Sequence, residues 1–254
     1  MIGRYTTGAV VLGRRASASF IINISFQSPS FPLVQATKQY YTRMPGLKAA
    51  TRGHTTMRTQ NAQVRGVIFD LDGTLIDIHI PFHIFRERLG IPDEGDILAF
   101  INNLPQSKQL EANRFIDEVE FAGIAESKPV SGLVETLAFL EEQGLPFAVV
   151  TRGSNQRSRA LLDHHGIKPG VLIGRDDAPP KPSPEPIHKA AGLMGLRAEE
   201  LLLVGDYFYD IEAGNQAGCT TVLLKRPWKK KFENKANYSI HQLSDLIPLL
   251  VELG

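Results

Sequence analysis

Two acidic side chains that follow an apolar run could carry out chemistry in this chain. Val67–Phe69 is predicted to form a buried strand, Asp70 ends it, and Asp72 follows two residues later. Carboxylates this close repel each other unless a cation or a shared proton relieves the repulsion. Hard divalent cations prefer oxygen ligands, so we expect a metal ion here. Asp70 would then be a ligand and a nucleophile, and Asp72 a proton donor and acceptor.

The loop after Asp70 is predicted to bind an anion. Gly73 is a turn signal, and ligands of open α/β sheets bind beyond the carboxyl ends of the strands. The backbone amides of this loop would be left free to hold an anion. An ordinary strand followed by an Asp-Gly turn is the alternative.

Two later segments each offer one polar side chain in a distinctive setting. The apolar run Phe147–Val150 ends at Thr151, whose hydroxyl can donate to a phosphate oxygen without adding charge, although a helix N-cap is an alternative role. Lys181 is the one cation in residues 177–187, which contain five prolines and are predicted to form neither helix nor central strand. This stiff loop would hold a point charge near a carboxylate cluster. A surface lysine in a linker is the competing interpretation.

Strand and helix patterns alternate from residue 129 onward, and these elements must position the residues above. The apolar run Leu201–Val204 is followed by two acids four residues apart, Asp206 and Asp210, and a terminal helix is expected over 241–253. Between residues 78 and 128 the strand signals stop. Three helices are expected there instead: Ile78–Leu89, Asp96–Asn103, and a longer one that Ser107 caps and that ends near Phe121.

The stretch Val67–Leu75, VIFDLDGTL, resembles the first motif of the haloacid dehalogenase superfamily, and specifically of its phosphatase branch. The dehalogenases generally lack the second acid, so Asp72 argues against dehalogenation. Thr151, the KPSPEP stretch around Lys181 and the GDYFYD stretch resemble the three later motifs, in the same order. Many relatives carry serine where this chain has Tyr207, a departure that leaves the acids intact.

The resemblance implies an α/β fold, in which a Rossmann-like, doubly wound parallel sheet carries a small inserted all-helical cap domain. Residues 63–77 and 129–254 would form the core, and residues 78–128 the cap. Residues 1–62 would be a disordered leader.

The resemblance also implies a magnesium-dependent phosphatase, which hydrolyses a small-molecule phosphomonoester through an aspartyl phosphate on Asp70. The residues implied to hold Mg²⁺ are Asp70, Asp72 through its backbone carbonyl, Asp206, and Asp210, the last through a water or a hydrogen bond to Lys181. The residues implied to bind phosphate are Thr151, Lys181, Leu71, Gly73, Arg152 and Gly153.

Substrate selection is expected to come from the cap and from Arg152. The cap residues expected to face the cleft are His79, His83, Arg86, Asn102, Asn103 and Lys108. Arg152 could contact an anionic substrate or pair with the acidic Asp176–Asp177 stretch. The partner is expected to be a small phosphorylated metabolite, such as a sugar phosphate, phosphoglycolate or a nucleotide. The sequence determines neither the substrate nor the oligomeric state.

Three rival functions use the same core. A phosphomutase would return the phosphoryl group to its substrate, and a catalytically silent protein would only bind a phosphorylated metabolite. A phosphonatase would need a lysine in the cap, for which Lys108 is the interior candidate. No nucleic-acid partner is expected. Membrane insertion is not expected either, because the apolar patch Ala16–Phe26 is too short to span a bilayer.

The first 69 residues differ in composition from the rest of the chain. They contain nine Lys and Arg and no Asp or Glu, whereas all 27 acids lie in the remainder. A basic, hydroxylated and acid-free leader is typical of an organellar transit peptide, which predicts a mitochondrial or other organellar location. A secretory signal and a nucleic-acid-binding arm are alternatives. The location would be cytosolic if translation started at Met44 or Met57.

Overall fold

The computed structural model describes residues 51–52, 63–93, 95–226 and 235–254, all within one compact unit, Val34–Gly254. The predicted leader lies outside the described residues, except for Thr51–Arg52. These two residues form strand β1, so the prediction of disorder is wrong there. Strand β1 pairs with the edge strand β9, whose backbone groups would otherwise lack ladder partners on that side. The transit peptide itself stays a prediction.

A seven-stranded sheet forms the centre of the described structure, in the order β1-β9-β8-β7-β2-β5-β6. Each pair of neighbours is parallel except β1 and β9, which run antiparallel. The remaining strands are β2 (Gly66–Phe69), β5 (Phe147–Val150), β6 (Val171–Ile173), β7 (Leu201–Gly205), β8 (Thr220–Leu224) and β9 (Tyr238–Ile240). This is the predicted Rossmann-like parallel sheet.

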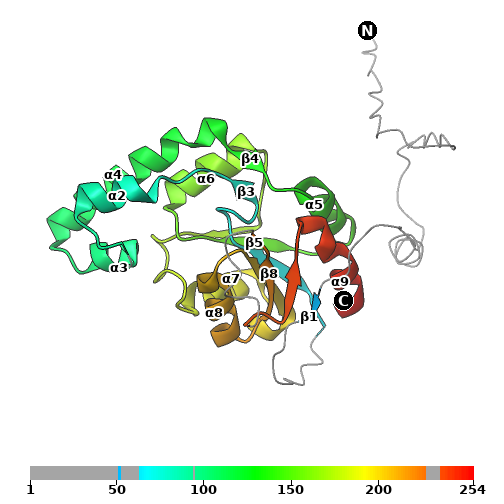
Figure 1. Cartoon of the computed structure of the whole chain (residues 1–254). Helices are drawn as coiled ribbons and strands as arrows, with labels where there is room; N and C mark the ends of the chain where they lie inside the picture. Colours follow the sequence, from blue (N-terminus) through cyan, green and yellow to red (C-terminus); the bar gives the residue numbers. More distant parts are fainter. Residues whose placement is uncertain (1–50, 53–62, 94, 227–234) are drawn as a thin grey trace, which may run out of the picture. The chain divides into compact units, whose positions relative to one another are not determined.

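Helices cover both faces of the sheet, because its central strands are apolar on both sides. In β2, Val67 and Phe69 pack into one buried cluster and Ile68 into another. The helices of the first cluster are α5 (Leu133–Glu142), α6 (Asn155–His164) and α9 (Leu246–Leu253). Those of the second are α7 (Glu185–Met194) and α8 (Phe208–Ala217), which lie together in Figure 1.

The strand register aligns the strand ends that carry the predicted site. Phe69 pairs with Val149 of β5 and with Val204 of β7. The residues that follow these three strands therefore emerge at one edge of the sheet. Asp70, Thr151 and Asp206 are among them.

A helical insert interrupts the core between two short strands, β3 (Ile76–Asp77) and β4 (Lys128–Pro129), which pair antiparallel. Its helices are α2 (Phe82–Leu89), α3 (Ile97–Asn102) and α4 (Gln106–Ala122), followed by the short turn η1 (Ile124–Glu126). Phe85, Ile101, Ala112 and Ile116 form a separate small core between these helices. Figure 1 shows α2, α3 and α4 grouped at one end of the described structure. Among the described helices, none combines the length and apolar character that crossing a membrane needs.

Four predictions about where helices begin are wrong, each beside a proline. Helix α2 begins at Phe82 after Pro81, not at Ile78. Helix α4 begins at Gln106 after Pro105, not with Ser107 as its cap. Helix α7 begins at Glu185, so the prediction that residues 177–187 form no helix is wrong for the last three of them. Pro186 lies in the first turn, where no backbone donor is needed. The C-terminal segment forms a 3₁₀ turn, η4 (Leu243–Asp245), before α9, because Pro248 is tolerated only within the first α-helical turn.

Gly132, which precedes α5, has a backbone conformation that excludes a side chain. Its φ is +83°, and a Cβ atom there would lie 2.3 Å from the backbone nitrogen of Ser244. We expect Gly132→Ala to lower the free energy of unfolding by about 2–4 kcal/mol, from the positive φ plus the clash. Urea denaturation measures the change.

Gly144→Ala is the matched control for this prediction. Gly144 also has a positive φ, of +63°, but no atom of the described residues lies within 4 Å of the position that a Cβ atom would occupy there. Its loss should be about 1–2 kcal/mol, from the backbone conformation alone. Equal losses for the two variants would contradict the packing argument at Gly132.

Candidate active site

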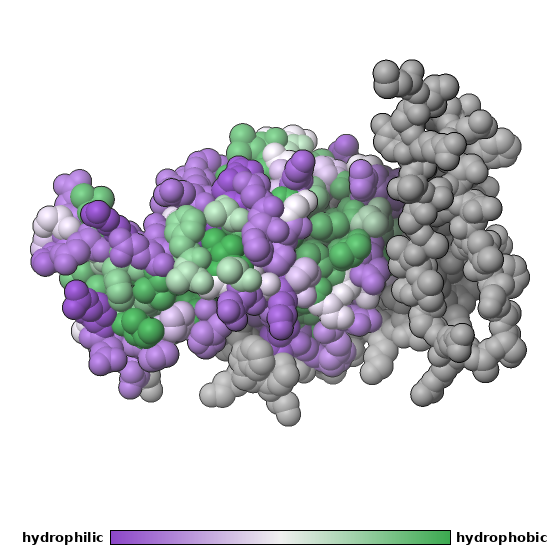
Figure 2. Space-filling view, turned by 90° about the horizontal axis from the view of Figure 1, so that it is seen from above, coloured by the Kyte–Doolittle hydropathy of each residue, from purple (hydrophilic) through white to green (hydrophobic). Residues whose placement is uncertain are grey.

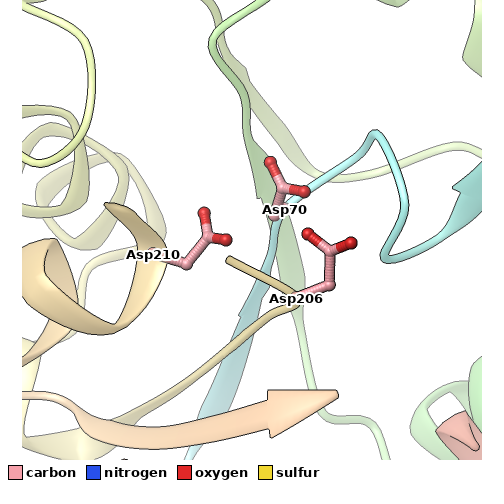
Figure 3. Close-up of side chains that lie close together, drawn as sticks. All are labelled: Asp70, Asp206 and Asp210. Carbon is pink, nitrogen blue, oxygen red and sulfur yellow. The ribbon is translucent and has the colours of Figure 1, made fainter. Parts of the chain in front are cut away.

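Three carboxylates gather at the edge of the sheet where the parallel strands end. Asp70 follows β2, Asp206 follows β7, and Asp210 lies in the first turn of α8. One oxygen atom from each lies within 4.8 Å of the other two, and all three residues are buried (Figure 3). Three hard oxygen ligands at this spacing suit a divalent cation such as Mg²⁺ or Ca²⁺. The donor set therefore fits the metal that the sequence predicts.

Lys181 lies against two of these carboxylates and is itself buried. Its Nζ atom is 2.8 Å from Asp70 Oδ1, 2.6 Å from Asp210 Oδ1 and 2.6 Å from the carbonyl oxygen of Val150. All three ammonium donors thus have a partner. Burial opposes the positive charge, but the carboxylates of Asp210 and Asp70 outweigh it and raise the pKa of Lys181. The ammonium group is therefore charged at neutral pH.

The loop that holds Asp70 is closed by its own backbone. The carbonyl of Leu71 accepts hydrogen bonds from the amides of Leu75 and Ile76, and the hydroxyl of Thr74 donates to Asp70 Oδ2 at 3.1 Å. The amide of Gly73, predicted to bind phosphate, donates instead to the carbonyl of Ile76 at 2.8 Å. The tight turn thus uses this amide in the structure described, and phosphate binding by Gly73 stays a prediction.

Gly73 has a different role in the geometry of the site. Its φ is +85°, and a Cβ atom there would lie 2.4 Å from Asp206 Oδ2. The missing side chain lets the carboxylate of Asp206 approach the loop. Glycine is required here both by the backbone conformation and by this close approach.

Asp72 lies in contact with Thr151 and with an arginine that the sequence did not single out. Thr151 Oγ1 is 3.4 Å from Asp72 Oδ2, and it also accepts a hydrogen bond from the amide of Gly153 at 3.1 Å. Arg157 Nη1 donates to Asp72 Oδ2 at 2.8 Å and lies 2.6 Å from Oδ1. Burial raises the pKa of Asp72, even though the guanidinium of Arg157 opposes the shift. A raised pKa favours the protonated form that a proton donor needs.

Arg152 pairs with the helical insert. Its Nη2 atom lies 2.9 Å and 2.7 Å from the two carboxylate oxygens of Asp96, the N-cap of α3, and its guanidinium covers the ring of Tyr209 at 4.1 Å. The alternative pairing with Asp176–Asp177 is wrong. Asp176 accepts from the amide of Asn155 at the start of α6, and Asp177 accepts from the amide of Gly174 in its own loop.

A cavity of about 700 Å³ lies between the sheet edge and the insert. Its walls include Asp70, Asp72 and Asp206 from the core and Ile80, Phe82, Phe85 and Ile116 from the insert. Figure 2 shows apolar surface on the part of the molecule that holds the insert, where Phe82, Ile84 and Leu110 are exposed. The wall of the cavity formed by the core thus carries charged side chains, and the wall formed by the insert is largely apolar.

Two of the six predicted cap candidates, His79 and Arg86, line this cavity. The side chain of Arg86 donates to the carbonyls of Pro92 and Gly95, so it also holds its own loop together. The other four are not among the lining residues: His83, Asn102, Asn103 and Lys108. Lys108, for example, pairs with Glu111 on the exposed face of α4.

Several residues that line the cavity, or that pair with a residue lining it, were not predicted from the sequence. They are Asp96, Asp117 and Glu120 on the insert and Arg157, Arg175 and Tyr209 on the core. Only Arg157 left a local signal: it precedes the buried Leu161 by four residues and therefore shares its inward helical face. The other residues depend on contacts between distant segments.

Comparison with known proteins places the chain in a family. The model of the haloacid dehalogenase-like hydrolases matches residues 67–224. The chain is 32% identical over 205 residues to a yeast protein named uncharacterized hydrolase YOR131C (Saccharomyces cerevisiae), an alignment that covers 75% of this chain and 93% of the yeast protein. It is 34% identical over 185 residues to a phosphoglycolate phosphatase of Pectobacterium atrosepticum, with 63% of this chain and 79% of that protein covered.

Solved structures show the same fold. A hydrolase from Pseudomonas syringae superposes with a TM-score of 0.63 at 21% identity, covering 74% of this chain and 99% of that one. The family match spans the strands and loops that carry Asp70, Thr151, Lys181 and Asp206. This chain is therefore a member of the haloacid dehalogenase-like hydrolase family and belongs to its phosphatase branch, the phosphoric monoester hydrolases.

Proposed function

We propose that this protein is a magnesium-dependent phosphatase that hydrolyses a small-molecule phosphomonoester through an aspartyl phosphate on Asp70. The observation that carries the proposal is the position of Asp70. Its carboxylate contacts the ammonium of Lys181 and lies in one cluster with the carboxylates of Asp206 and Asp210. A nucleophilic carboxylate among groups that can balance the charge of a phosphate is what phosphoryl transfer requires.

Asp70, Asp206 and the backbone carbonyl of Asp72 would hold Mg²⁺, with Asp210 beside them. When bound, this ion neutralises phosphate charge and orients the ester. Lys181, which bridges Asp70 and Asp210, adds a fixed positive charge next to the nucleophile. Thr151, at the end of β5, would donate its hydroxyl hydrogen to a phosphate oxygen.

The reaction would proceed in two steps on the side chains of the protein. In the first, a carboxylate oxygen of Asp70 forms a bond to phosphorus while the bond to the leaving oxygen breaks, and Asp72 gives its proton to that oxygen. In the second, Asp72 takes a proton from water as the water oxygen attacks phosphorus. Inorganic phosphate leaves and the carboxylate of Asp70 is restored. Proton transfer of this kind typically contributes about 10²–10⁴-fold to the rate.

The cavity supports a small substrate. A volume of about 700 Å³ is within the range of sites for small molecules, and the insert lines it with apolar side chains. Relatives that carry the name phosphoglycolate phosphatase make two-carbon and sugar phosphates the first compounds to test.

Substitution of the proposed nucleophile tests the function most directly. Wild-type protein should release inorganic phosphate from at least one small phosphomonoester without a bisphosphate activator, which a mutase would need. Asp70→Asn should lower the rate at least about 10³-fold, because the amide cannot form the acyl phosphate. Asp163→Asn, on the exposed face of α6, is the control and should retain the activity. Release that survives Asp70→Asn would refute the mechanism.

Metal binding can be measured without turnover. Mg²⁺ should raise the melting temperature, since binding at about 100 times Kd stabilises a folded protein by about 2.7 kcal/mol, or about 5–10 °C for a domain of this size. The cause is relief of repulsion among Asp70, Asp206 and Asp210. Asp206→Asn should remove most of this shift. The same shift in that variant would mean that the ion binds elsewhere.

A further inference from the structure

Arg157 lies between the proposed proton donor and the helical insert. It belongs to α6 of the core, and its side chain is fully buried. On one side, Nη1 contacts both carboxylate oxygens of Asp72. On the other side, Nε is 3.6 Å from Oε2 of Glu120, in the last turns of α4. One guanidinium group thus joins a loop of the sheet edge to a helix of the insert.

This arrangement is poorly explained by stability alone. Among the described residues, Nε and Nη2 of Arg157 form no hydrogen bond, and neither does Oε2 of Glu120. Burying a guanidinium with incomplete partners costs free energy, and apolar side chains of similar volume often stabilise a core as well or better. Burial also raises the pKa of Glu120 to about 7, although Arg157 opposes the shift. The buried charges therefore suggest a role in geometry.

The contacts of Asp72 indicate what that geometry is. Its Oδ2 atom accepts from Arg157 and lies next to the hydroxyl of Thr151, at the end of β5 where the phosphate group is proposed to bind. Its Oδ1 atom is buried and forms no hydrogen bond among the described residues. Nη1 of Arg157 nevertheless lies 2.6 Å from Oδ1, so the guanidinium fixes the orientation of the whole carboxyl group, with Oδ2 next to the Thr151 hydroxyl.

We infer that Arg157 is a positioning residue, which holds the carboxyl group of Asp72 for proton transfer to the leaving oxygen, and that Glu120 fixes the guanidinium from the insert. The inference rests on the proposed function, because it assigns Asp72 the donor role. It also makes the placement of the donor depend on a residue from a different part of the fold. Arg157 itself touches neither the nucleophile nor the metal cluster in the contacts described.

The inference can be tested with two substrates whose leaving groups differ in basicity, and therefore in their need for a proton. An alkyl phosphomonoester releases an alkoxide, which must be protonated, whereas p-nitrophenyl phosphate releases a stable phenolate. The parameter to compare is kcat/KM, which covers the steps up to formation of the aspartyl phosphate. The later proton transfer from water, which both substrates share, then does not enter the comparison.

Arg157→Gln should lower kcat/KM about 100-fold for the alkyl ester and less than about 5-fold for the aryl ester. Glu120→Gln should cause a smaller loss with the same selectivity, since the guanidinium keeps its contact with Asp72. Arg157→Lys should recover part of the alkyl activity. Arg159→Gln, an exposed position on the same helix, is the control and should change neither value.

Equal losses for both esters in Arg157→Gln, or no loss for either, would overturn the positioning role. If that variant does not fold, Glu120→Gln and Arg157→Lys decide the question by the same ratio of the two esters. Wild-type protein that hydrolyses neither ester in the presence of Mg²⁺, nor any of the small phosphomonoesters, would instead overturn the proposed function itself.

Discussion

The structure of the site depends on the charge balance around the ammonium group of Lys181. Three carboxylates within 4.8 Å of one another could not stay ionised at a buried sheet edge without a cation. Lys181 bonds Asp70, Asp210 and the carbonyl of Val150, and so ties the ends of β2 and β5 to the start of α8. It offsets part of the repulsion among these carboxylates. The rigid proline-rich loop makes this possible, because a flexible chain would have to lose more conformational entropy to hold the ammonium there.

The site residues that could be predicted from the sequence share one property. Asp70, Thr151 and Asp206 each follow an apolar run, and the parallel register brings the ends of such runs to one edge. A strand end is a local feature, which a single sequence reveals. The sheet architecture is predictable for the same reason. Lys181 was identifiable because it is the one cation in a segment with five prolines. Such a segment holds its side chains in a stiff loop, unlike the exposed helix faces where most lysines lie.

The residues that could not be predicted act through pairings between distant segments. Arg152 and Asp96 are 56 positions apart, and nothing local distinguishes Asp96 from Asp176 or Asp177 as a partner. No local pattern favours His79 over His83 at the cavity either. His79 precedes α2 and His83 lies in its first turn, and which of them lines the cavity follows from how the insert packs. The hydrogen bond from the amide of Gly73 to the carbonyl of Ile76 could not be predicted for a related reason: turn chemistry predicts that a loop bends, but not which of its amides the bend itself uses.

The three ion pairs that the described residues form between the insert and the core share one polarity. The core supplies Arg152, Arg157 and Arg175, and the insert supplies Asp96, Glu120 and Asp117 respectively. Charge complementarity therefore favours one orientation of the insert relative to the edge of the sheet. It also bears on substrate selection, because Arg152 and Arg175 line the cavity while paired. An anionic group on the leaving half of a substrate would have to compete with Asp96 or Asp117 for its arginine, and would loosen the insert as it bound. A substrate whose leaving group is neutral would leave both ion pairs intact. The ion pairs that hold the insert against the core would therefore make binding of an anionic leaving group less favourable than binding of a neutral one.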